Sequence, residues 1–219
     1  MKRIIYLSLV ALSLTFTSCT AIVKGLAKLV VKDYNDHTDV NLSKLQLKDS
    51  NGHTQSLGET FRGKTVYLYV WKDDNSPPPS EKNKEYKALK ARFAKYGDVV
   101  FANLYVGSES KPGSYNLVEN DFSSQIASVL TVQSAAPFII GKDGSILVYR
   151  GPKPGDKVLV DYVLYNAKHG IDGTRSAKKL IRGVNGKQQF KTQELREWYT
   201  NHFGKAPDES LSFGVSTTN

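Results

Sequence analysis

The stretch "GKTVYLYVWKDDNSPPPSE", residues 63–81, decides the fold. Residues 63–71 are almost continuously apolar, a pattern typical of a central strand that is covered on both faces. A polar loop follows, then three consecutive prolines at Pro77, Pro78 and Pro79. Residues 79–96 place Tyr86 and other apolar side chains at helical spacing, with lysines on the opposite side. The stretch therefore predicts a buried strand, a loop and an amphipathic helix.

The flanking sequence extends this pattern in both directions. Residues 98–107 read as a second buried strand, residues 119–130 as a helix, and residues 155–169 as another helix. Two hairpins are predicted, one turning at Asn51-Gly52 and one at Asp143-Gly144. Strands that alternate with helices and end in an antiparallel pair indicate an α/β protein with a mixed sheet covered by helices.

Residues 41–170 resemble the thioredoxin superfamily, and most closely its envelope-anchored thiol-disulfide oxidoreductases of the TlpA and ResA type. The segment "DSNGHTQSLGETFRGKTVYLYVW" is similar to the family's lead-in, which ends at Trp71. The family continues with W-C-P-P-C-x-x-E, where this chain has "NSPPPSE". Ser76 then falls at the first cysteine, Pro77 and Pro78 at the two prolines, and Pro79 at the second cysteine.

A second likeness lies in "AAPFIIGKDGSILVYRG", which resembles the family's cis-proline hairpin, although Gly141 stands where the family has an aspartate. Pro137 would be the cis-proline. The resemblance implies a thioredoxin-like three-layer fold, with a C-terminal helical extension beyond residue 170. It also implies a substrate groove between Ser76 and Pro137. The small side chain of Ala136 would leave the backbone edge there open to an extended peptide.

The family's redox activity is not expected to carry over. Thiol-disulfide exchange needs a thiolate nucleophile and a second thiol that resolves the mixed disulfide. The chain has one cysteine, Cys19, far from this loop. Ser76 is instead expected to cap the following helix, with the prolines in its first turn. Two alternatives stay open: a retained peptide-binding groove, or a non-thiol enzyme that uses Asp73, Asp74 and Ser76.

The N-terminus predicts a lipoprotein. Residues 1–18 have two basic residues followed by a short apolar run, which is typical of a cleaved signal. The residues before Cys19 resemble a lipobox, so Cys19 is expected to be lipidated and to anchor the protein in the membrane. The expected location is the bacterial cell envelope, on the outer membrane facing the periplasm. A net charge of +9 favours anionic partners.

Residues 19–40 are predicted to form a tether or an amphipathic segment. Lys24, Lys28 and Lys32 recur every four residues, so that on a helix they would form one stripe. Such a helix could lie on the membrane surface beside the lipid anchor. A plain tether and a helix packed on the domain are the alternatives.

Residues 171–219 form a basic extension. Between residues 175 and 191 there is no acidic residue and there are six basic ones: Arg175, Lys178, Lys179, Arg182, Lys187 and Lys191. This run could contact anionic lipid or an acidic partner. A helix is then predicted after Thr192, with Trp198 and Tyr199 on one apolar face and Gly204 at its end. That face either docks on the domain or binds a partner. Residues 205–219 are expected to be a disordered tail.

The remaining polar residues suggest no further chemistry. The four histidines have no metal-ligand spacing, and Asp73, Asp74 and Asn75 are too few for a calcium site. No metal, no cofactor and no nucleic acid are expected. The sequence therefore predicts a redox-inactive, thioredoxin-like lipoprotein that binds an envelope protein as an adaptor or accessory subunit. A membrane-surface structural protein is a further alternative.

Overall fold

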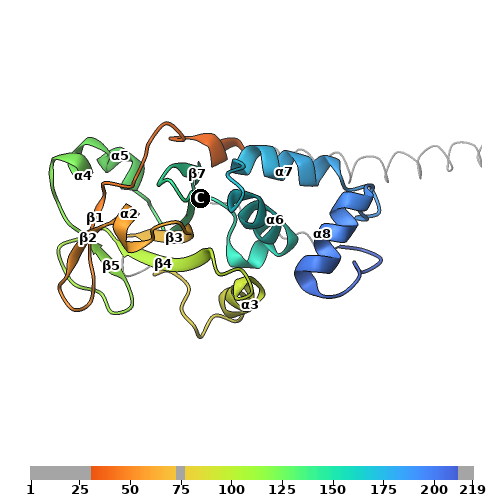
Figure 1. Ribbon diagram of the computed structural model, residues 1–219, viewed down its shortest axis with the longest axis horizontal. Helices are drawn as coiled ribbons and strands as arrows, with labels where there is room; N and C mark the ends of the chain where they lie inside the picture. The colour runs from red at the N-terminus through yellow and green to blue at the C-terminus, as the bar shows by residue number, and fades with distance from the viewer. Residues whose placement is uncertain (1–30, 73–76, 212–219) are drawn as a thin grey trace, which may run out of the picture.

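The computed structural model describes residues 31–72 and 77–211 of the chain. These residues form one mixed sheet with the strand order β2-β1-β5-β4-β3-β6-β7. The strands are β1 (Gln46–Lys48), β2 (Thr54–Ser56), β3 (Thr65–Trp71), β4 (Val99–Tyr105), β5 (Tyr115–Leu117), β6 (Ala136–Ile140) and β7 (Ile146–Val148). Helices lie on both faces of the sheet (Figure 1).

Strand β3 is the centre of the sheet. It pairs in parallel with β4 over its whole length and antiparallel with β6, and β6 pairs antiparallel with β7. Both predicted hairpins are confirmed. Gly52 and Gly144 occupy their turns with φ of 86° and 88°, a backbone conformation that glycine adopts at low cost. Strand β5, between β4 and β1, was not predicted.

The side chains of β3 alternate between two hydrophobic clusters. Val66, Leu68 and Val70 point to one face, and Tyr67 and Tyr69 point to the other. This alternation is the two-residue period of a strand, and every residue of β3 is buried because both faces are covered. The arrangement is the predicted three-layer α/β fold.

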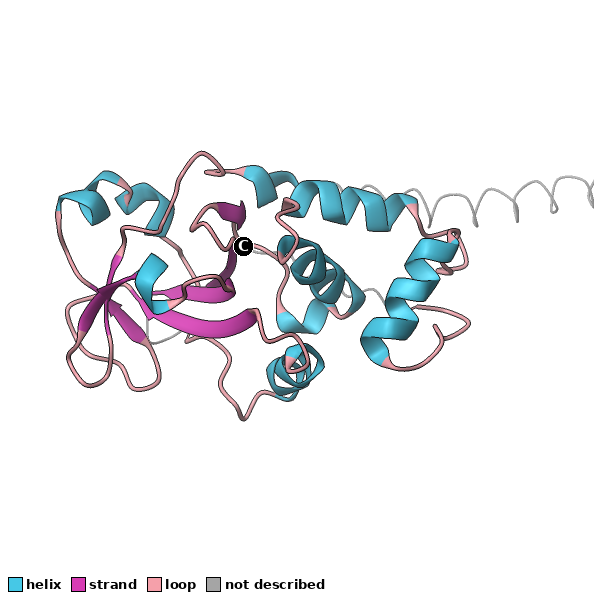
Figure 2. Cartoon of the chain, viewed as in Figure 1, coloured by secondary structure: helices cyan, strands magenta, loops and turns pink. Residues whose placement is uncertain are grey.

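The helical elements are η1 (Lys32–Asn35), α2 (Leu57–Thr60), α3 (Lys84–Phe93), α4 (Asp121–Gln125), α5 (Ala127–Leu130), η2 (Pro154–Asp156), α6 (Val158–Ala167), α7 (Gly173–Arg182) and α8 (Gln193–Phe203). Figure 2 shows them around the strands. The helix predicted over 119–130 is two short helices that meet at Ile126. Helix α6 is buried almost all round, because it lies between the sheet and the C-terminal extension.

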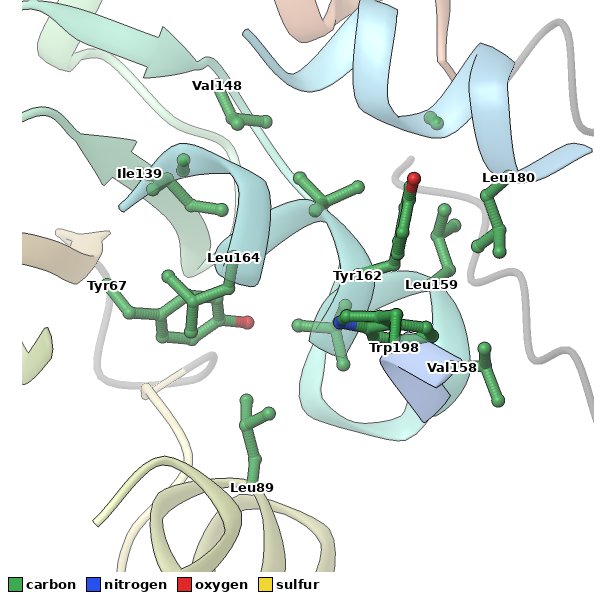
Figure 3. Packing of buried hydrophobic residues seen from close by; sticks show 14 of the residues in the cluster. Tyr67, Leu89, Ile139, Val148, Val158, Leu159, Tyr162, Leu164, Leu180 and Trp198 are labelled. Atoms are coloured by element: carbon green, nitrogen blue, oxygen red, sulfur yellow. The ribbon is translucent and has the colours of Figure 1, made fainter. Parts of the chain in front are cut away.

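The C-terminal extension packs on the domain through α8. Leu195, Trp198 and Tyr199 are buried in the same cluster as α6, and the Trp198 ring meets Tyr162 edge-on at 4.6 Å (Figure 3). The docking interpretation of this helix is confirmed. The alternative, in which Trp198 and Tyr199 form a partner surface, is wrong because both side chains are buried.

Two predicted boundaries change. Val31 and Tyr34 are buried in the core, so the folded domain begins about ten residues before position 41 and the tether is shorter than predicted. The tail is not disordered as far as residue 211. Leu211 is buried, and its N–H donates to the carbonyl of Gln188 at 2.9 Å. Both boundaries differ from the prediction because apolar side chains near each end of the described chain are buried in the core.

The described part of the chain contains no helix that is both long and apolar enough to cross a bilayer. The predicted signal peptide, Cys19, Lys24 and Lys28 lie outside the described residues, as do Asp73, Asp74 and Ser76. Lys32 is the first residue of η1, and its side chain is not among those described.

Candidate functional site

The end of β3, where the resemblance places the active site, is tied into the sheet. Trp71 is buried, and its Nε1–H donates to the hydroxyl of Ser114 at 3.3 Å. Its ring lies against Tyr105 at the end of β4, with 4.8 Å between the ring centroids. Trp71 therefore joins neighbouring strands at this end and offers little of its ring to a ligand.

The proline run does not begin the helix. Pro77, Pro78 and Pro79 have no regular secondary structure, and α3 starts at Lys84. The cap is Asn83, whose side-chain oxygen accepts from the N–H of Tyr86 at 2.9 Å. The prediction that Ser76 caps this helix with the prolines in its first turn is wrong. A residue that precedes a proline is disfavoured in the helical conformation, which accounts for the absence of helix at Pro77 and Pro78.

The predicted edge at Ala136 and Pro137 is part of β6. No peptide bond among the described residues is cis, so the expectation of a cis-proline at Pro137 is wrong. Ala136 lies in β6 opposite Val70 of β3, and the Pro137 carbonyl accepts from the N–H of Gly151 at 2.6 Å. Both residues lie in β6, whose edge toward β3 is paired at Ala136 and Pro137. Ser76, on the other side of the predicted groove, lies outside the described residues, so the groove stays a prediction.

A different site forms at the C-terminal extension, on helix α7. Gly173, Ser176, Ala177 and Leu180 bury one side of this helix against the domain. The opposite side is exposed and carries Arg175, Lys178, Lys179 and Arg182, here called the α7 basic face. This face lines an open pocket of about 580 Å³. Asn35 from η1 and Thr192 and Glu194 from the start of α8 complete its walls.

Three charges of the α7 basic face are not neutralised by neighbours. Lys179 pairs with Glu194 at 2.6 Å, and the Glu194 carboxylate raises the pKa of Lys179. Asp172 also lines the pocket, but its carboxylate caps α7 by accepting from the backbone N–H of Arg175 at 2.7 Å. Among the described residues, the side chains of Arg175, Lys178 and Arg182 have no acidic partner. Basic side chains that are exposed, clustered and unpaired can bind an anion.

The chain enters the fold beside this face. The hydroxyl of Thr174 donates to the carbonyl of Val31 at 3.3 Å, which places the first described residue next to α7. Helix η1 also contacts α7. The described part of the chain therefore begins next to α7, the helix that carries the α7 basic face.

The sequence analysis singled out the four basic residues but did not predict the helix on which they lie. Their spacing at i, i+3, i+4 and i+7 is the signal that could have found it. The sequence of α7 shows no stripe of large apolar residues, because three of its four buried residues are glycine, serine and alanine. Gly173 has to be small because an added Cβ would lie 2.6 Å from Val148 in β7.

The other polar clusters of the described residues do not form a reactive centre. No group of three or more His, Cys, Asp or Glu side chains there is placed to hold a metal ion. Arg92 and His202 both pair with the carboxylate of Asp161, but the side chains of Asp161 and His202 are fully buried. A substrate could not reach them, so this cluster has a structural role.

We compared the chain with known families, curated proteins and solved structures. No protein-family model and no curated protein matches the sequence. Among solved structures, a Bacteroides vulgatus protein assigned as a thiol-disulfide oxidoreductase is 18% identical and has a TM-score of 0.39, with 58% of this chain and 96% of that chain covered. For a Chlorobium tepidum protein assigned as the thiol:disulfide interchange protein DsbE, the identity is 15%, the TM-score 0.42 and the coverage 58% and 94%. Because both TM-scores are below 0.5, the assignment of the fold rests on the strand topology and not on these structures.

The topology itself identifies the fold. A parallel pair, β3 and β4, is joined through α3, and an antiparallel hairpin, β6 and β7, continues the sheet from β3 and is followed by α6. This order of strands and helices, with helices on both faces, is the core of the thioredoxin superfamily. The chain has a thioredoxin-like fold.

Proposed function

We propose that this protein is a redox-inactive, thioredoxin-like lipoprotein of the bacterial cell envelope, and that it acts by binding, as an adaptor or accessory subunit. The observation that carries the proposal is the position of the single cysteine. Cys19 precedes the first described residue by twelve positions, and Ser76 and Pro79 stand where the resemblance would place the two active-site cysteines. Dithiol exchange needs two cysteines in one site, and this chain cannot supply them.

What the fold presents supports the binding role. At the end where the resemblance would place the active site, Ala136 pairs with Val70 and the Pro137 carbonyl accepts from the N–H of Gly151. The α7 basic face is exposed and lines an open pocket. An anionic surface is the partner that such a face suits. The envelope location rests on the signal-like N-terminus and the lipobox-like residues before Cys19, which would tether the domain to a membrane.

Reduction of insulin by dithiothreitol tests the redox part of the proposal. The chain from residue 20 onwards keeps every described residue and has no cysteine. We expect it to add nothing to the rate given by dithiothreitol alone, while a thioredoxin in the same assay accelerates the reaction. The full-length chain should behave in the same way. Turnover by the full-length chain that is lost in Cys19→Ser would contradict the proposal.

Metabolic labelling with a radioactive fatty acid tests the anchor. We expect the full-length protein to be labelled and to sediment with membranes in the bacterial cell. The Cys19→Ser variant should carry no label, because the thiol that accepts the lipid is missing. Equal labelling of both forms would rule out Cys19 as the lipidation site.

A further inference from the structure

The α7 basic face combines charge with exposure. Arg175, Lys178 and Arg182 are exposed and have no acidic partner among the described residues, whereas Lys179 is paired with Glu194. Guanidinium and ammonium groups that are free of carboxylates bind phosphate oxygens well. The pocket beside them, of about 580 Å³, is open and can admit a phosphate with its substituents.

The position of the face in the chain restricts which phosphates it can meet. Thr174 of α7 is bonded to the carbonyl of Val31, and Cys19 lies twelve residues before Val31. Even a fully extended chain of that length spans at most about 40 Å, and a helix of that length spans about 18 Å. A lipid on Cys19 therefore holds Val31, beside the start of the α7 basic face, within about 40 Å of the bilayer.

A lipid tether on Cys19 makes membrane lipids the expected ligand of the α7 basic face. A domain held this close to a bilayer meets lipid headgroups at a far higher effective concentration than it meets any soluble anion. The charges also suit the surface, because juxtamembrane arginine and lysine side chains are attracted to anionic lipids. Figure 1 shows α6, α7 and α8 grouped at one end of the molecule, with β1, β2 and β5 at the other.

We infer that the α7 basic face docks the domain on the membrane by binding the phosphates of anionic lipid headgroups in the pocket beside Arg175, Lys178 and Arg182. This inference deepens the proposed function by naming the partner of its binding surface. Docking would fix how the tethered domain is oriented.

Vesicle binding without the lipid anchor tests the inference separately from the proposed lipidation. The chain from residue 20 onwards is mixed with vesicles of phosphatidylcholine containing 30% phosphatidylglycerol, and with vesicles of phosphatidylcholine alone. We expect binding to the first only, weakening as salt is raised. Because each basic side chain near an anionic surface contributes about a five-fold change in partitioning, R175Q/K178Q/R182Q should lose about 100-fold.

A variant with the same loss of charge is the matched control. Lys44, Lys84 and Lys87 are exposed and lie away from α7, so K44Q/K84Q/K87Q should lose much less binding than the α7 variant. Circular dichroism should show that both variants fold, because all six side chains are exposed. Equal losses in the two variants would overturn the inference, as would equal binding of the unchanged chain to both kinds of vesicle.

Two competitors separate the membrane from other anions. Inorganic phosphate should displace the protein from vesicles no better than sodium chloride of equal ionic strength, and displacement specific to phosphate would point to a soluble phosphate ligand instead. A polyglutamate peptide should bind more weakly than the anionic vesicles. Tighter binding of the peptide, lost in R175Q/K178Q/R182Q, would replace the membrane with an acidic protein partner.

Discussion

His202 Nε2 lies 2.6 Å from Asp161 Oδ1, and neither side chain is exposed to solvent. Arg92 donates to both oxygens of the same carboxylate, at 2.7 and 2.8 Å. The Tyr96 hydroxyl lies 3.0 Å from His202 Nδ1. One carboxylate thus joins α6 to a side chain of α3 and a side chain of α8. The C-terminal extension is consequently part of the same core as the thioredoxin-like domain.

Removal of this carboxylate should be costly. Asp161→Ala leaves the Arg92 and His202 side chains without their common acceptor, so we expect the free energy of unfolding to fall by about 3–5 kcal/mol. Urea unfolding followed by circular dichroism measures the change. Asp39→Ala, at an exposed acid, is the control and should change stability by less than about 0.5 kcal/mol. A loss that is equally small in Asp161→Ala would show that the cluster does not hold the extension in place.

Trp198 supports the packing of α8 by its ring and not by its polar atom. Its Nε1–H is buried with no hydrogen-bond partner in the structure. Trp198→Ala should cost about 3–5 kcal/mol, because it leaves a cavity beside Tyr162. Trp198→Phe should cost clearly less, since it keeps an aromatic ring and breaks no hydrogen bond. Thermal unfolding of the two variants measures the difference, and similar losses in both would mean that the indole N–H has a partner.

Features set by local sequence could be predicted. Asn51-Gly52 and Asp143-Gly144 form their turns because glycine takes the required positive φ, and β3 is buried because its residues are apolar throughout. The layered α/β class followed from these elements. Each signal acts within a few residues, so one sequence is enough to read it.

Features set by tertiary contact could not be predicted. The aromatic face of α8 was compatible with docking or with a partner, and only the position of α6 decides that Trp198 is buried. Helix α7 was missed because small residues such as Ala177 make its inner contacts. The pairing of Ala136 with Val70 likewise depends on where β6 meets β3. The resemblance suggested an open edge at Ala136, and the edge toward β3 is paired.

Acid should weaken the β6–β7 hairpin through Asp143. Hydrogen bonds from the hydroxyl and backbone N–H of Ser145 lower the pKa of this carboxyl. A lowered pKa means that the stabilisation is complete above the pKa of an unfolded aspartate, about 3.9, and is lost as the pH falls through the folded value. Asp143→Asn should therefore be less stable than the unchanged protein near neutral pH, with a smaller difference under acid.

Urea midpoints at about pH 6 and about pH 3 test this expectation. Asp39→Asn serves as the comparison, because Asp39 is an exposed acid outside the hairpin. It should keep the pH dependence of the unchanged protein. A pH dependence that is the same in Asp143→Asn and in the unchanged chain would show that Asp143 does not contribute to acid sensitivity.

The late start of α3 predicts how a cysteine would behave in the loop where the resemblance places the family's active site. The N-terminus of a helix lowers a thiol pKa only within about one turn. In a Cys19→Ser background, Pro79→Cys lies four residues before the cap of α3, whereas Asn83→Cys lies at the cap. The thiol at position 83 should have the lower pKa, measured by the pH dependence of its reaction with iodoacetamide. A lower pKa at position 79 would mean that the helix begins earlier in solution.

Photo-crosslinking in living bacteria tests most directly whether the protein binds through α7 and not through the former active-site end. A benzophenone side chain is placed at position 178 in one variant and at position 77 in another, both exposed and both in the full-length, anchored protein. Irradiation should give crosslinks from position 178, to lipid if the membrane is the partner, and none above background from position 77. Crosslinks from position 77 alone would contradict the account.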